Sequence, residues 1–490
     1  MKNNNSIYWY DLETFGIDSR RDRIAQFAGI RTDEQLNIID DPLISYCQLS
    51  DEILPDPMSC LVTGITPSEV NAKGVNEAAF IKGIHQAFTA SNTCVAGYNS
   101  IRFDDEFMRN TLYRNFYDPY EREWKNGNSR WDIIDMVRLT HALRPEGINW
   151  PKNEEGVTTF RLEKLTAANN IAHEMAHDAM SDVYATIAMA KLIREKQPKL
   201  FDFVYQHRNK HAVAAYLKVR DATPVIHISS KYPASNHCMA VVVPLAVHPN
   251  NQNAYIVYDL SVDPADLISL DAKSIQKRIF TATDQLDDGE TRIPLKAVHI
   301  NKCPVIVPVN TLDAASAARL SLDLASCEEN LALILAEQKK GGDNLSQKIK
   351  QVFAEANYDK SDDPEFNLYA GFLNDNDKQK MQWVRSATAS SINNIGAIFD
   401  DSRLTELFLR YKARNFPATL STDEQQAWND YRYSRLLEDD NTSTLSLTAF
   451  KVRIQALKSD KTLSPDKNAI LDALLSYADS LELPGLVAQA

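Results

Sequence analysis

The sequence predicts an α/β domain with a central sheet, followed by a small β-rich, barrel-like domain and a helical carboxyl-terminal domain. Strand-like and helix-like segments alternate over residues 1 to about 195. Short strands broken by Pro, Asn and Gly follow over about 200–350, and helical periodicity dominates from about 365 to the end. At about 100–200 residues per domain, the 490 residues suffice for two to four domains.

The first region alternates predicted strands and helices. Segments rich in β-branched and aromatic residues predict strands over 6–13, 24–33 and 94–100. Helical periodicity predicts helices over 76–88, 104–116 and 181–196. This alternation is typical of an α/β domain with a mixed central sheet.

The later regions differ in character from the first and from each other. Residues 194–202 indicate the exit from the first domain, and the polar stretch 357–367 predicts a linker. Strands are predicted over 223–230, 238–249, 254–260 and 293–310, and helices near 311–338 and over 403–416, 424–438 and 467–481. We therefore expect domains at 1–197, 198–353 and 354–490.

Composition excludes several classes of protein. The six cysteines have no C-x-x-C spacing, which argues for a reducing cytoplasm and against a disulfide framework or a cysteine-rich zinc site. The chain has no apolar run of about 18 residues and no secretory signal at its start, so we expect no membrane span. A net charge of −13 disfavours nonspecific coating of nucleic acid, so binding to nucleic acid would need a local basic channel.

Two acids stand in the first predicted strand, within the apolar run IYWYDLETFG. Asp11 and Glu13 are two residues apart, so their side chains point to the same face of a strand. Neighbouring carboxylates repel each other and raise each other's pKa, and a divalent cation removes that cost. Oxygen ligands suit Mg²⁺ or Mn²⁺ rather than zinc. The alternative is a pair of solvated acids at a strand end.

Further candidates lie in two later segments. Asp104 follows a predicted buried strand, and Asp182 lies at the edge of an apolar helical stripe; alone, each is equally well explained as a surface aspartate. His177 precedes Asp182 by five residues, so the two side chains converge only if a helix starts between them. Asp178 is a suitable N-cap for that helix. His177 would then lie in the preceding loop and could accept a proton from water, or be an ordinary surface histidine.

A competing motif overlaps these residues. HEMAH, at 173–177, fits the H-E-x-x-H signature of zinc peptidases, with its histidines as ligands, its glutamate as base and Glu195 as a third ligand. That interpretation requires 173–177 to be helical, whereas a cap at Asp178 would break the helix. It also leaves the acids of the first strand unexplained.

Three motifs occur in order along the chain: Asp11-Leu-Glu13, Asn99-x-x-x-Phe103-Asp104 and His177-x-Ala179-x-x-Asp182. This ordered set resembles the DEDD-type 3′→5′ exonucleases of the proofreading-exonuclease superfamily, in the subgroup with a histidine base. The segments YDLETFG, RFDDEFMRN, AHDAMSDVYATIAMAKL, HINKCP and YKARNFPATL are similar to the bacterial exodeoxyribonuclease I family. That similarity covers nearly the whole chain and is densest over residues 7–200.

The resemblance implies a fold, an activity and a metal site. It implies an RNase H-like nuclease domain, an SH3-like β-barrel domain and an α-helical carboxyl-terminal domain. It also implies processive 3′→5′ degradation of single-stranded DNA to 5′-mononucleotides in DNA repair and recombination. Asp11, Glu13, Asp104 and Asp182 would hold two Mg²⁺ ions, for which Mn²⁺ could substitute, and His177 would take the proton from the attacking water.

The resemblance also assigns substrate contacts and a partner. Residues 109–138 are rich in arginine and aromatic side chains, a pattern that core packing explains equally well. The family positions that contact DNA correspond to Arg109, Tyr120, Trp124, Arg138, Arg161, Glu13 and His177. The family further implies docking of the acidic tail of the single-stranded DNA-binding protein on a basic patch, for which Arg144 is a candidate. We expect a monomer.

Three rival interpretations remain open. A related exoribonuclease would carry the same core motifs, and the other two rivals are the zinc peptidase and a catalytically silent scaffold. The domain-sized extension beyond residue 200 and the segment 113–151 favour the DNA enzyme, because they match that family.

Overall fold

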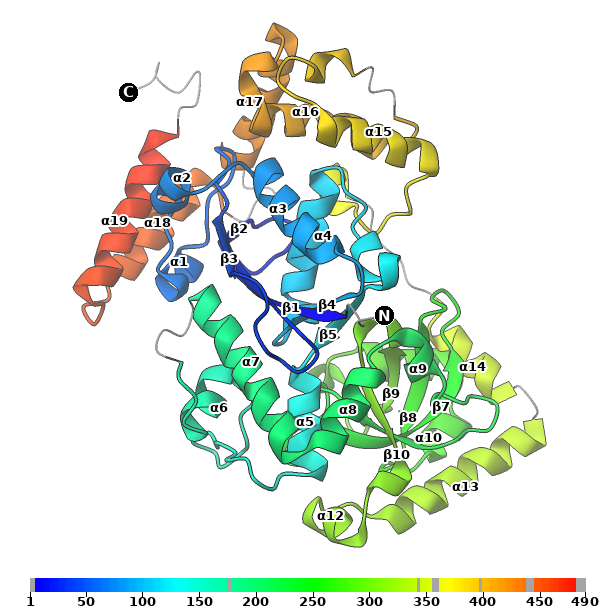
Figure 1. Ribbon diagram of the computed structural model, residues 1–490. Coiled ribbons are helices and arrows are strands. Elements are labelled where there is room, and N and C mark those ends of the chain that lie inside the picture. The colour runs from blue at the N-terminus through cyan, green and yellow to red at the C-terminus, as the bar shows by residue number, and fades with distance from the viewer. Residues whose placement is uncertain are drawn as a thin grey trace. The chain divides into compact units, whose positions relative to one another are not determined.

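The structure is a computed structural model that describes residues 5–173, 178–341, 344–354, 361–395, 399–437 and 445–481. The chain forms two compact units (Figure 1). The first comprises Met1–Ser129, Glu174–Tyr184 and Tyr358–Ala490, and the second comprises Arg130–His173 and Ala185–Asn357. Among the described residues, no helix has both the length and the apolar character needed to cross a membrane.

A mixed sheet forms the centre of the first unit, as predicted. Its strands there are β1 (Ser6–Thr14), β2 (Ile24–Thr32), β3 (Leu43–Tyr46) and β4 (Thr93–Gly97), in the order β3-β2-β1-β4. β1 runs antiparallel to β2 and parallel to β4. The register places Asp11 opposite Ala28 and Glu13 opposite Gln26, and an irregularity follows Glu13, where the strand ends.

The alternation of side chains along β1 decides what each face of the strand carries. Tyr8, Tyr10 and Leu12 pack into one buried core with Phe27 and Phe88. Burying such a side chain stabilises the fold by about 1.5–3 kcal/mol, so the strand's orientation is strongly determined. The odd-numbered positions, which include the two acids, therefore face the other side.

Helices α3 (Glu77–Thr89) and α4 (Asp104–Arg114) cover the sheet on the Tyr8 side. α1 (Pro57–Thr63), α2 (Pro67–Lys73) and the start of α7 (Ala179–Lys196) also belong to the first unit. α3 begins where Asn76 caps the Ala79 amide. Apolar side chains of α3 and α4 complete the core that holds Tyr8 and Tyr10.

The carboxyl-terminal helices also belong to the first unit. They are α15 (Asp375–Ser386), α16 (Ser402–Asn415), α17 (Thr422–Leu437), α18 (Leu447–Lys458) and α19 (Pro465–Ser480). α18 and α19 lie beside α1 and share a core with it (Figure 1). α15 and α16 pack on Tyr113 and Phe116 at the end of α4. The predicted helices are confirmed, whereas α15 and α18 were not predicted.

A buried group of charges, which we call the Glu365 cluster, joins the carboxyl-terminal region to the strands. Glu365 is 3% exposed and pairs with Arg23 at 2.9 Å and with Arg414 at 2.6 Å. Arg414 also pairs with Glu52 at 2.9 Å, and Arg410 lies 3.4 Å from Glu365. The end of the stretch 357–367 is therefore a buried anchor and not an exposed linker, because its acid finds partners distant in sequence.

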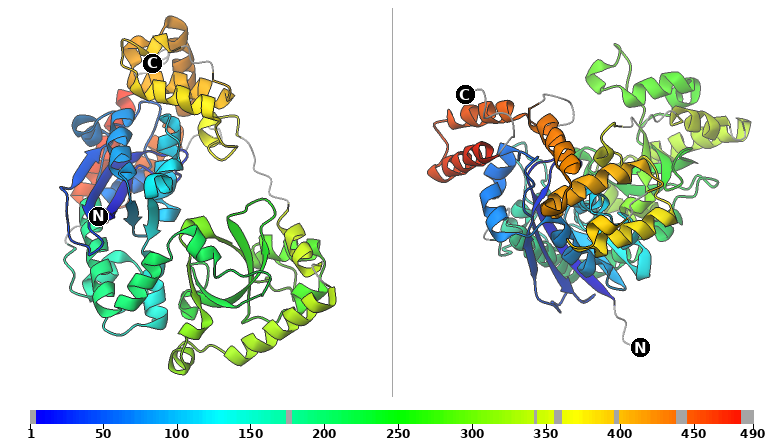
Figure 2. Two further views of the ribbon diagram at one scale, coloured as in Figure 1. Left: turned by 45° about the vertical axis from the view of Figure 1, so that its right-hand side comes forward. Right: turned by 90° about the horizontal axis from the view of Figure 1, so that it is seen from above.

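The second unit contains the predicted β-rich domain. Its strands are β6 (Val225–Ile228), β7 (Met239–Val247), β8 (Ala254–Asp259), β9 (Leu295–His299) and β10 (Val305–Pro308). These five strands form an antiparallel sheet in the order β10-β6-β7-β8-β9, which curves strongly (Figure 2). β5 (Ser129–Asp132), which begins at the unit boundary, is not part of this sheet. α13 (Leu324–Gly341) and α14 (Asn344–Val352) pack against this sheet through a shared core.

Among its described residues, the second unit also contains the rest of α7 and seven further α-helices. The seven are α5 (Ile134–Leu143), α6 (Leu162–Ala168), α8 (Pro198–Gln206), α9 (Lys210–Ala214), α10 (Ala265–Ser269), α11 (Ala272–Phe280) and α12 (Ala314–Arg319). The predicted domain exit at 194–202 is mostly helical, because Pro198 takes the first position of α8, where a missing amide hydrogen costs nothing.

Candidate functional site

An acid cluster lies at the end of β1. Oxygen atoms of Asp11 and Glu13 on β1 and of Asp182 on α7 lie within 4.8 Å of one another. The prediction that the two strand acids share a face is therefore confirmed. Asp182 reaches them from the first turn of α7, so the cluster joins a strand to a helix that lies about 170 residues away in sequence.

Asp104 contributes to the same electrostatic environment. It is the first residue of α4, which follows β4 after a turn in which Asn99 has a positive φ of 60°. The Asp104 side chain is 5% exposed, and its charge is the largest charge effect on the pKa of Asp11. The structure thus brings three of the four predicted acids into one cluster and places the fourth, Asp104, where its charge acts on Asp11.

Ionising Asp11 and Glu13 costs free energy at their positions in the fold, so their pKa values are raised. Burial, followed by the charges of Asp104 and Asp182, raises the pKa of Asp11 well above its ordinary value. Burial, followed by the charges of Asp11 and Asp182, raises the pKa of Glu13 to about 9. A divalent cation would relieve both costs, and an all-oxygen donor set fits Mg²⁺ or Mn²⁺. The residues present therefore fit a metal centre.

These shifts predict how the stability of the protein depends on pH and metal. The folded pKa of Glu13, about 9, exceeds its ordinary value of 4.5, so between these values the folded state holds a proton that the unfolded state has lost. Without metal, the free energy of unfolding should fall as pH rises through this window. Bound Mg²⁺ replaces the proton, so we expect Mg²⁺ to raise Tm more at about pH 9 than at about pH 6.

Thermal unfolding in EDTA and in Mg²⁺ across this pH range measures the effect. Glu13→Gln serves as the control, because it removes one of the two titrating strand acids and should weaken the pH dependence of the Mg²⁺ effect. A gain in Tm that is the same at both pH values in the unmodified protein would contradict the assignment.

The start of α7 agrees with the predicted helix cap. α7 begins at Ala179, and Asp178 Oδ1 accepts a hydrogen bond from the Ser181 amide at 3.0 Å. The candidate base His177 and the rest of 174–177 lie outside the described residues. His173, the first residue of the H-E-x-x-H motif, lies in a non-helical segment, and its Nδ1 is 3.0 Å from Thr166 Oγ1. The described part of that motif is therefore not the helix that a zinc peptidase site requires.

A buried carboxylate outside the acid cluster, that of Asp105, supports the cluster and was not predicted. Asp105 is 2% exposed, and its Oδ1 accepts hydrogen bonds from Tyr10 Oη at 2.9 Å and Arg122 Nη2 at 2.7 Å. Tyr10 adjoins Asp11, and Asp105 adjoins Asp104, so this network fixes β1 relative to α4. The doubled aspartate after a buried strand was the only sequence signal for it.

The predicted DNA contacts in the first unit differ in exposure. Arg109 is buried, and its Nε and Nη2 donate to Glu123 at 2.8 and 3.1 Å. Its guanidinium lies 5.4 Å from the centre of the Tyr120 ring. Trp124 is 65% exposed. The segment thus combines buried arginines with an accessible aromatic side chain.

The predicted contacts in the second unit also differ. Arg138 is buried on α5 and donates to Asp135 at 2.5 Å. Arg161 is exposed at the amino end of α6, which fits both a substrate contact and an ordinary surface arginine. Arg144 is half-buried and donates to the carbonyl oxygens of Leu143 and Thr311.

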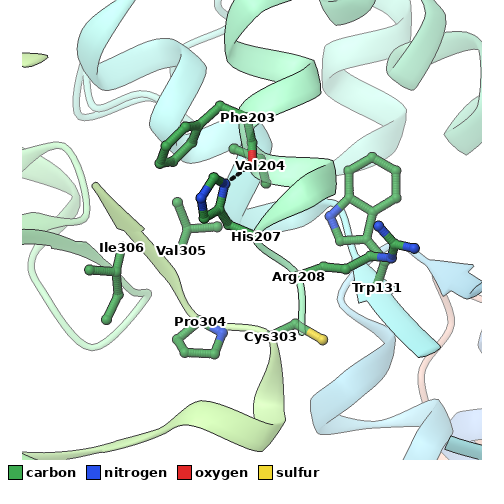
Figure 3. Close-up of a pocket in the computed structure, with 9 residues that line it drawn as sticks. All are labelled: Trp131, Phe203, Val204, His207, Arg208, Cys303, Pro304, Val305 and Ile306. Atoms are coloured by element: carbon green, nitrogen blue, oxygen red, sulfur yellow. Dashed lines mark hydrogen bonds between the residues drawn. The ribbon is translucent and has the colours of Figure 1, made fainter. Parts of the chain in front are cut away.

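A small cavity in the second unit is not part of the acid cluster. It is lined by side chains at the end of α8, by β10 and by Trp131 and Cys303 (Figure 3). His207 Nδ1 lies 2.7 Å from the carbonyl oxygen of Phe203 at its edge. No carboxylate lines this cavity, so it lacks the donors that a Mg²⁺ site needs.

Family models match three consecutive segments of the chain. The model described as Exonuclease matches residues 8–190, the Exonuclease I SH3-like domain matches 208–355, and the Exonuclease I C-terminal domain matches 362–481. The acid cluster lies entirely within the first of these segments.

Sequence similarity to known proteins extends over nearly the whole chain. Exodeoxyribonuclease I of Escherichia coli (strain K12) is 43% identical over 98% of this chain and 99% of its own length. Oligoribonuclease of Legionella pneumophila (strain Corby) is 36% identical but covers only 38% of this chain. The similarity to an exoribonuclease therefore extends over little more than a third of this chain.

Solved structures of similar proteins also match this chain over nearly its whole length. Exonuclease I from Methylocaldum szegediense has a TM-score of 0.93 at 49% identity and covers 97% of this chain and 99% of its own. E. coli Exonuclease I in complex with a dA16 oligonucleotide has a TM-score of 0.93 at 43% identity, with 98% and 100% covered. A structure of SSB/Exonuclease I in complex with the inhibitor CFAM has a TM-score of 0.89 at 42% identity, with the same coverage.

Proposed function

Because this chain belongs to the exodeoxyribonuclease I family, we propose that it degrades single-stranded DNA processively from the 3′ end to 5′-mononucleotides, in DNA repair and recombination. The observation that carries the proposal is the acid cluster of Asp11, Glu13 and Asp182, with Asp104 beside it. The dA16 complex of the E. coli enzyme, whose fold matches over 98% of this chain, supports the choice of substrate.

The acid cluster would hold the metal ions of the reaction. Asp11, Glu13, Asp104 and Asp182 are the proposed ligands of two Mg²⁺ ions, with Mn²⁺ as a substitute. Bound divalent ions would activate a water and stabilise the leaving 3′ oxygen. The chain's own contribution is to hold its acids in place through β1, α4 and the Tyr10–Asp105–Arg122 contacts.

His177 is the proposed proton acceptor. Asp178 caps α7, which begins at Ala179 and carries Asp182 in its first turn. The neutral imidazole of His177 could take the proton of the attacking water near neutral pH. We also propose that His177 and Glu13 contact the terminal nucleotide.

The remaining proposed DNA contacts include both exposed and buried side chains. Trp124 and Arg161 are accessible for stacking and for a phosphate contact. Ion pairs with Glu123 and Asp135 hold Arg109 and Arg138 in fixed orientations beside aromatic rings, those of Tyr120 and Phe160 respectively. We propose that Tyr120, Arg109 and Arg138 also line the path of the strand.

Further parts of the proposal concern partners and organisation. The SSB/Exonuclease I structure supports docking of the acidic tail of the single-stranded DNA-binding protein, for which Arg144 is the candidate contact. We propose that the protein acts as a monomer in the cytoplasm, where its six cysteines, all free thiols in the structure, would stay reduced. The proposed domains are 1–197, 198–353 and 354–490.

A substrate panel tests this function. Labelled single-stranded DNA, RNA and casein are each incubated with the protein in EDTA and then with added Mg²⁺ or Zn²⁺. We expect Mg²⁺-dependent release of mononucleotides from DNA alone. Release from RNA would favour the exoribonuclease, casein cleavage in Zn²⁺ would favour the peptidase, and no DNA cleavage with any metal would refute the proposal.

Truncating Trp124 tests the proposed path of the strand. Stacking of a base on an aromatic side chain is worth about 1–3 kcal/mol, so Trp124→Ala should weaken binding of long single strands by about tenfold or more. Hydrolysis of very short strands that end before this residue should change less. Equal losses for long and short strands, measured as kcat/KM, would argue against a place for Trp124 in the channel.

A further inference from the structure

Two histidine side chains lie next to each other in the second unit. His141 is on α5, and His237 follows the short helix Ala234–Asn236, just before β7. Their ring centres are 5.2 Å apart, and the planes of the two rings are inclined at 36°. His141 is 8% exposed, and His237 is half-buried. Neither histidine has a part in the proposed nuclease reaction, so their pairing needs an explanation of its own.

One ring nitrogen of each histidine lacks a hydrogen-bond partner. Nδ1 of His141 and Nδ1 of His237 are both buried, and neither forms a hydrogen bond with any described residue. A buried polar atom without a partner costs free energy, so such atoms are rare in folded proteins. Two of them on neighbouring rings point to a ligand that both nitrogens bind.

Thr158 favours Nδ1 of His141 as the nitrogen that accepts a ligand. The hydroxyl oxygen of Thr158 lies 3.2 Å from Nε2 of His141. With the Nε2 proton directed at this oxygen, the lone pair of the neutral ring is on Nδ1. Histidines that bind metals commonly have their other nitrogen held by a hydrogen bond in this way. The contact therefore prepares His141 to bind a metal ion through Nδ1.

Both rings are held in place by their surroundings. The ring centres of Trp150 and Phe160 lie 5.0 and 5.4 Å from that of His141. His237 has a positive φ of 54°, and its amide donates to the carbonyl oxygen of Ala234 at 2.9 Å. Two ligands that are already ordered bind an ion with a smaller loss of conformational entropy.

Both rings are neutral at neutral pH, as metal ligands must be. Burial, followed by the charges of His237, Arg319 and Lys152, lowers the pKa of His141 to about 4. Burial, followed by the charge of Arg319, lowers the pKa of His237. Arg319 and Lys152 also repel a divalent cation, and for the same reason they favour an anion such as chloride as a further ligand of that ion.

The distance between the rings fits a single zinc ion. Zinc binds imidazole nitrogens at about 2.0–2.1 Å in tetrahedral geometry, which places the centres of two bound rings about 5 Å apart. Imidazole suits Zn²⁺, Cu²⁺ and Ni²⁺, whereas Mg²⁺ prefers oxygen ligands. This pair of histidines therefore differs in its metal preference from the all-oxygen acid cluster.

We propose that Nδ1 of His141 and Nδ1 of His237 bind one transition metal ion, with Zn²⁺ as the expected occupant and solvent or an anion as its remaining ligands. The ion would join α5 to the turn before β7 and so stabilise the second unit. Only two side chains bind it, so we expect weaker binding than at a structural zinc site with four protein ligands. The inference goes beyond the proposed nuclease function and does not depend on it.

Counting bound zinc ions tests the site. Isothermal titration calorimetry with Zn²⁺ is carried out in excess Mg²⁺, which competes for oxygen-ligand sites. We expect His141→Ala and His237→Ala each to bind one Zn²⁺ fewer than the unmodified protein. Thr158→Val keeps both ligands but loses the hydrogen bond to Nε2, so it should bind this ion about tenfold or more weakly.

A matched control removes another histidine of the same unit. His211 is exposed on α9, and His211→Ala should bind as many zinc ions as the unmodified protein. The Tm of each variant in EDTA shows whether its fold is retained. If the buried position of His141 does not tolerate alanine, His237→Ala decides the test, because its side chain is only half-buried in a turn.

The outcomes separate this inference from the proposed function. The loss of one bound Zn²⁺ in the histidine variants that fold, but not in His211→Ala, supports the site. If a folded His141→Ala or His237→Ala binds as many zinc ions as the unmodified protein, the two-histidine site is refuted. None of these measurements involves hydrolysis of DNA, so the zinc site and the proposed function are supported or refuted separately.

Discussion

Asp11→Asn is expected to lower the rate of single-stranded DNA hydrolysis at least about a thousandfold, because charge stabilisation by a bound metal is worth several kcal/mol. Asp11 lies at the centre of the acid cluster, where its pKa responds to both Asp104 and Asp182. Asparagine keeps the shape of the side chain but loses the charge that attracts a cation. Initial rates of mononucleotide release in Mg²⁺ measure the effect.

The stability of the same variant distinguishes lost chemistry from lost structure. In EDTA, Asp11→Asn removes one of several mutually repelling buried acids, so its Tm should equal or exceed that of the unmodified protein. Asp41→Asn, at an exposed aspartate, is the control and should keep both activity and Tm. Full activity in Asp11→Asn would remove Asp11 from the mechanism.

Glu365→Gln is expected to lower the free energy of unfolding by about 3–5 kcal/mol, because removing one partner leaves buried charges uncompensated. Its carboxylate pairs with Arg23 and Arg414 and lies near Arg410, all of which are nearly inaccessible to solvent. Total stabilities are about 5–15 kcal/mol, so this loss is large. Urea unfolding measures this loss of free energy. Glu69→Gln is the control: Glu69 forms an exposed pair with Lys73, so this change should alter the free energy of unfolding little.

The pH dependence of the free energy of unfolding is a second measure of how much the Glu365 cluster stabilises the fold. Although burial opposes it, the charges of Arg414, Arg23 and other arginines lower the pKa of Glu365 well below its ordinary value. Glu77, an acid that pairs with Arg114, likewise has a pKa of about 2 despite its burial. The ionised carboxylates of Glu365 and Glu77 therefore stabilise the folded state above their ordinary pKa of about 4.5. This stabilisation is lost as pH falls below that value. Glu365→Gln should therefore unfold in acid with a shallower pH dependence, and an unchanged slope would contradict the assignment.

Local rules were sufficient to predict most of the acid cluster. The period of two along a strand placed Asp11 and Glu13 on one face, and the buried Tyr8, Tyr10 and Leu12 explain why the strand keeps that orientation. The capping preference of Asp178 correctly predicted where α7 begins, and hence that Asp182 lies in its first turn.

Features that depend on distant contacts were not predicted. Asp105 meets Tyr10 across 95 positions of sequence, and Arg23 meets Glu365 across 342. Periodicity and capping describe neighbours within a few residues, so neither reports such a pair. For the same reason, the polar composition of 357–367 predicted a linker, although Glu365 is one of the most deeply buried acids of the first unit.

The most direct test of the central claim follows both ends of one strand. A single-stranded DNA that carries a different label at each end is incubated with the protein in EDTA and in Mg²⁺, and the products are separated over time. The account predicts that the 3′ label is released first, as a 5′-mononucleotide, and only in Mg²⁺. Release of the 5′ label first, or equal release in EDTA, would contradict it.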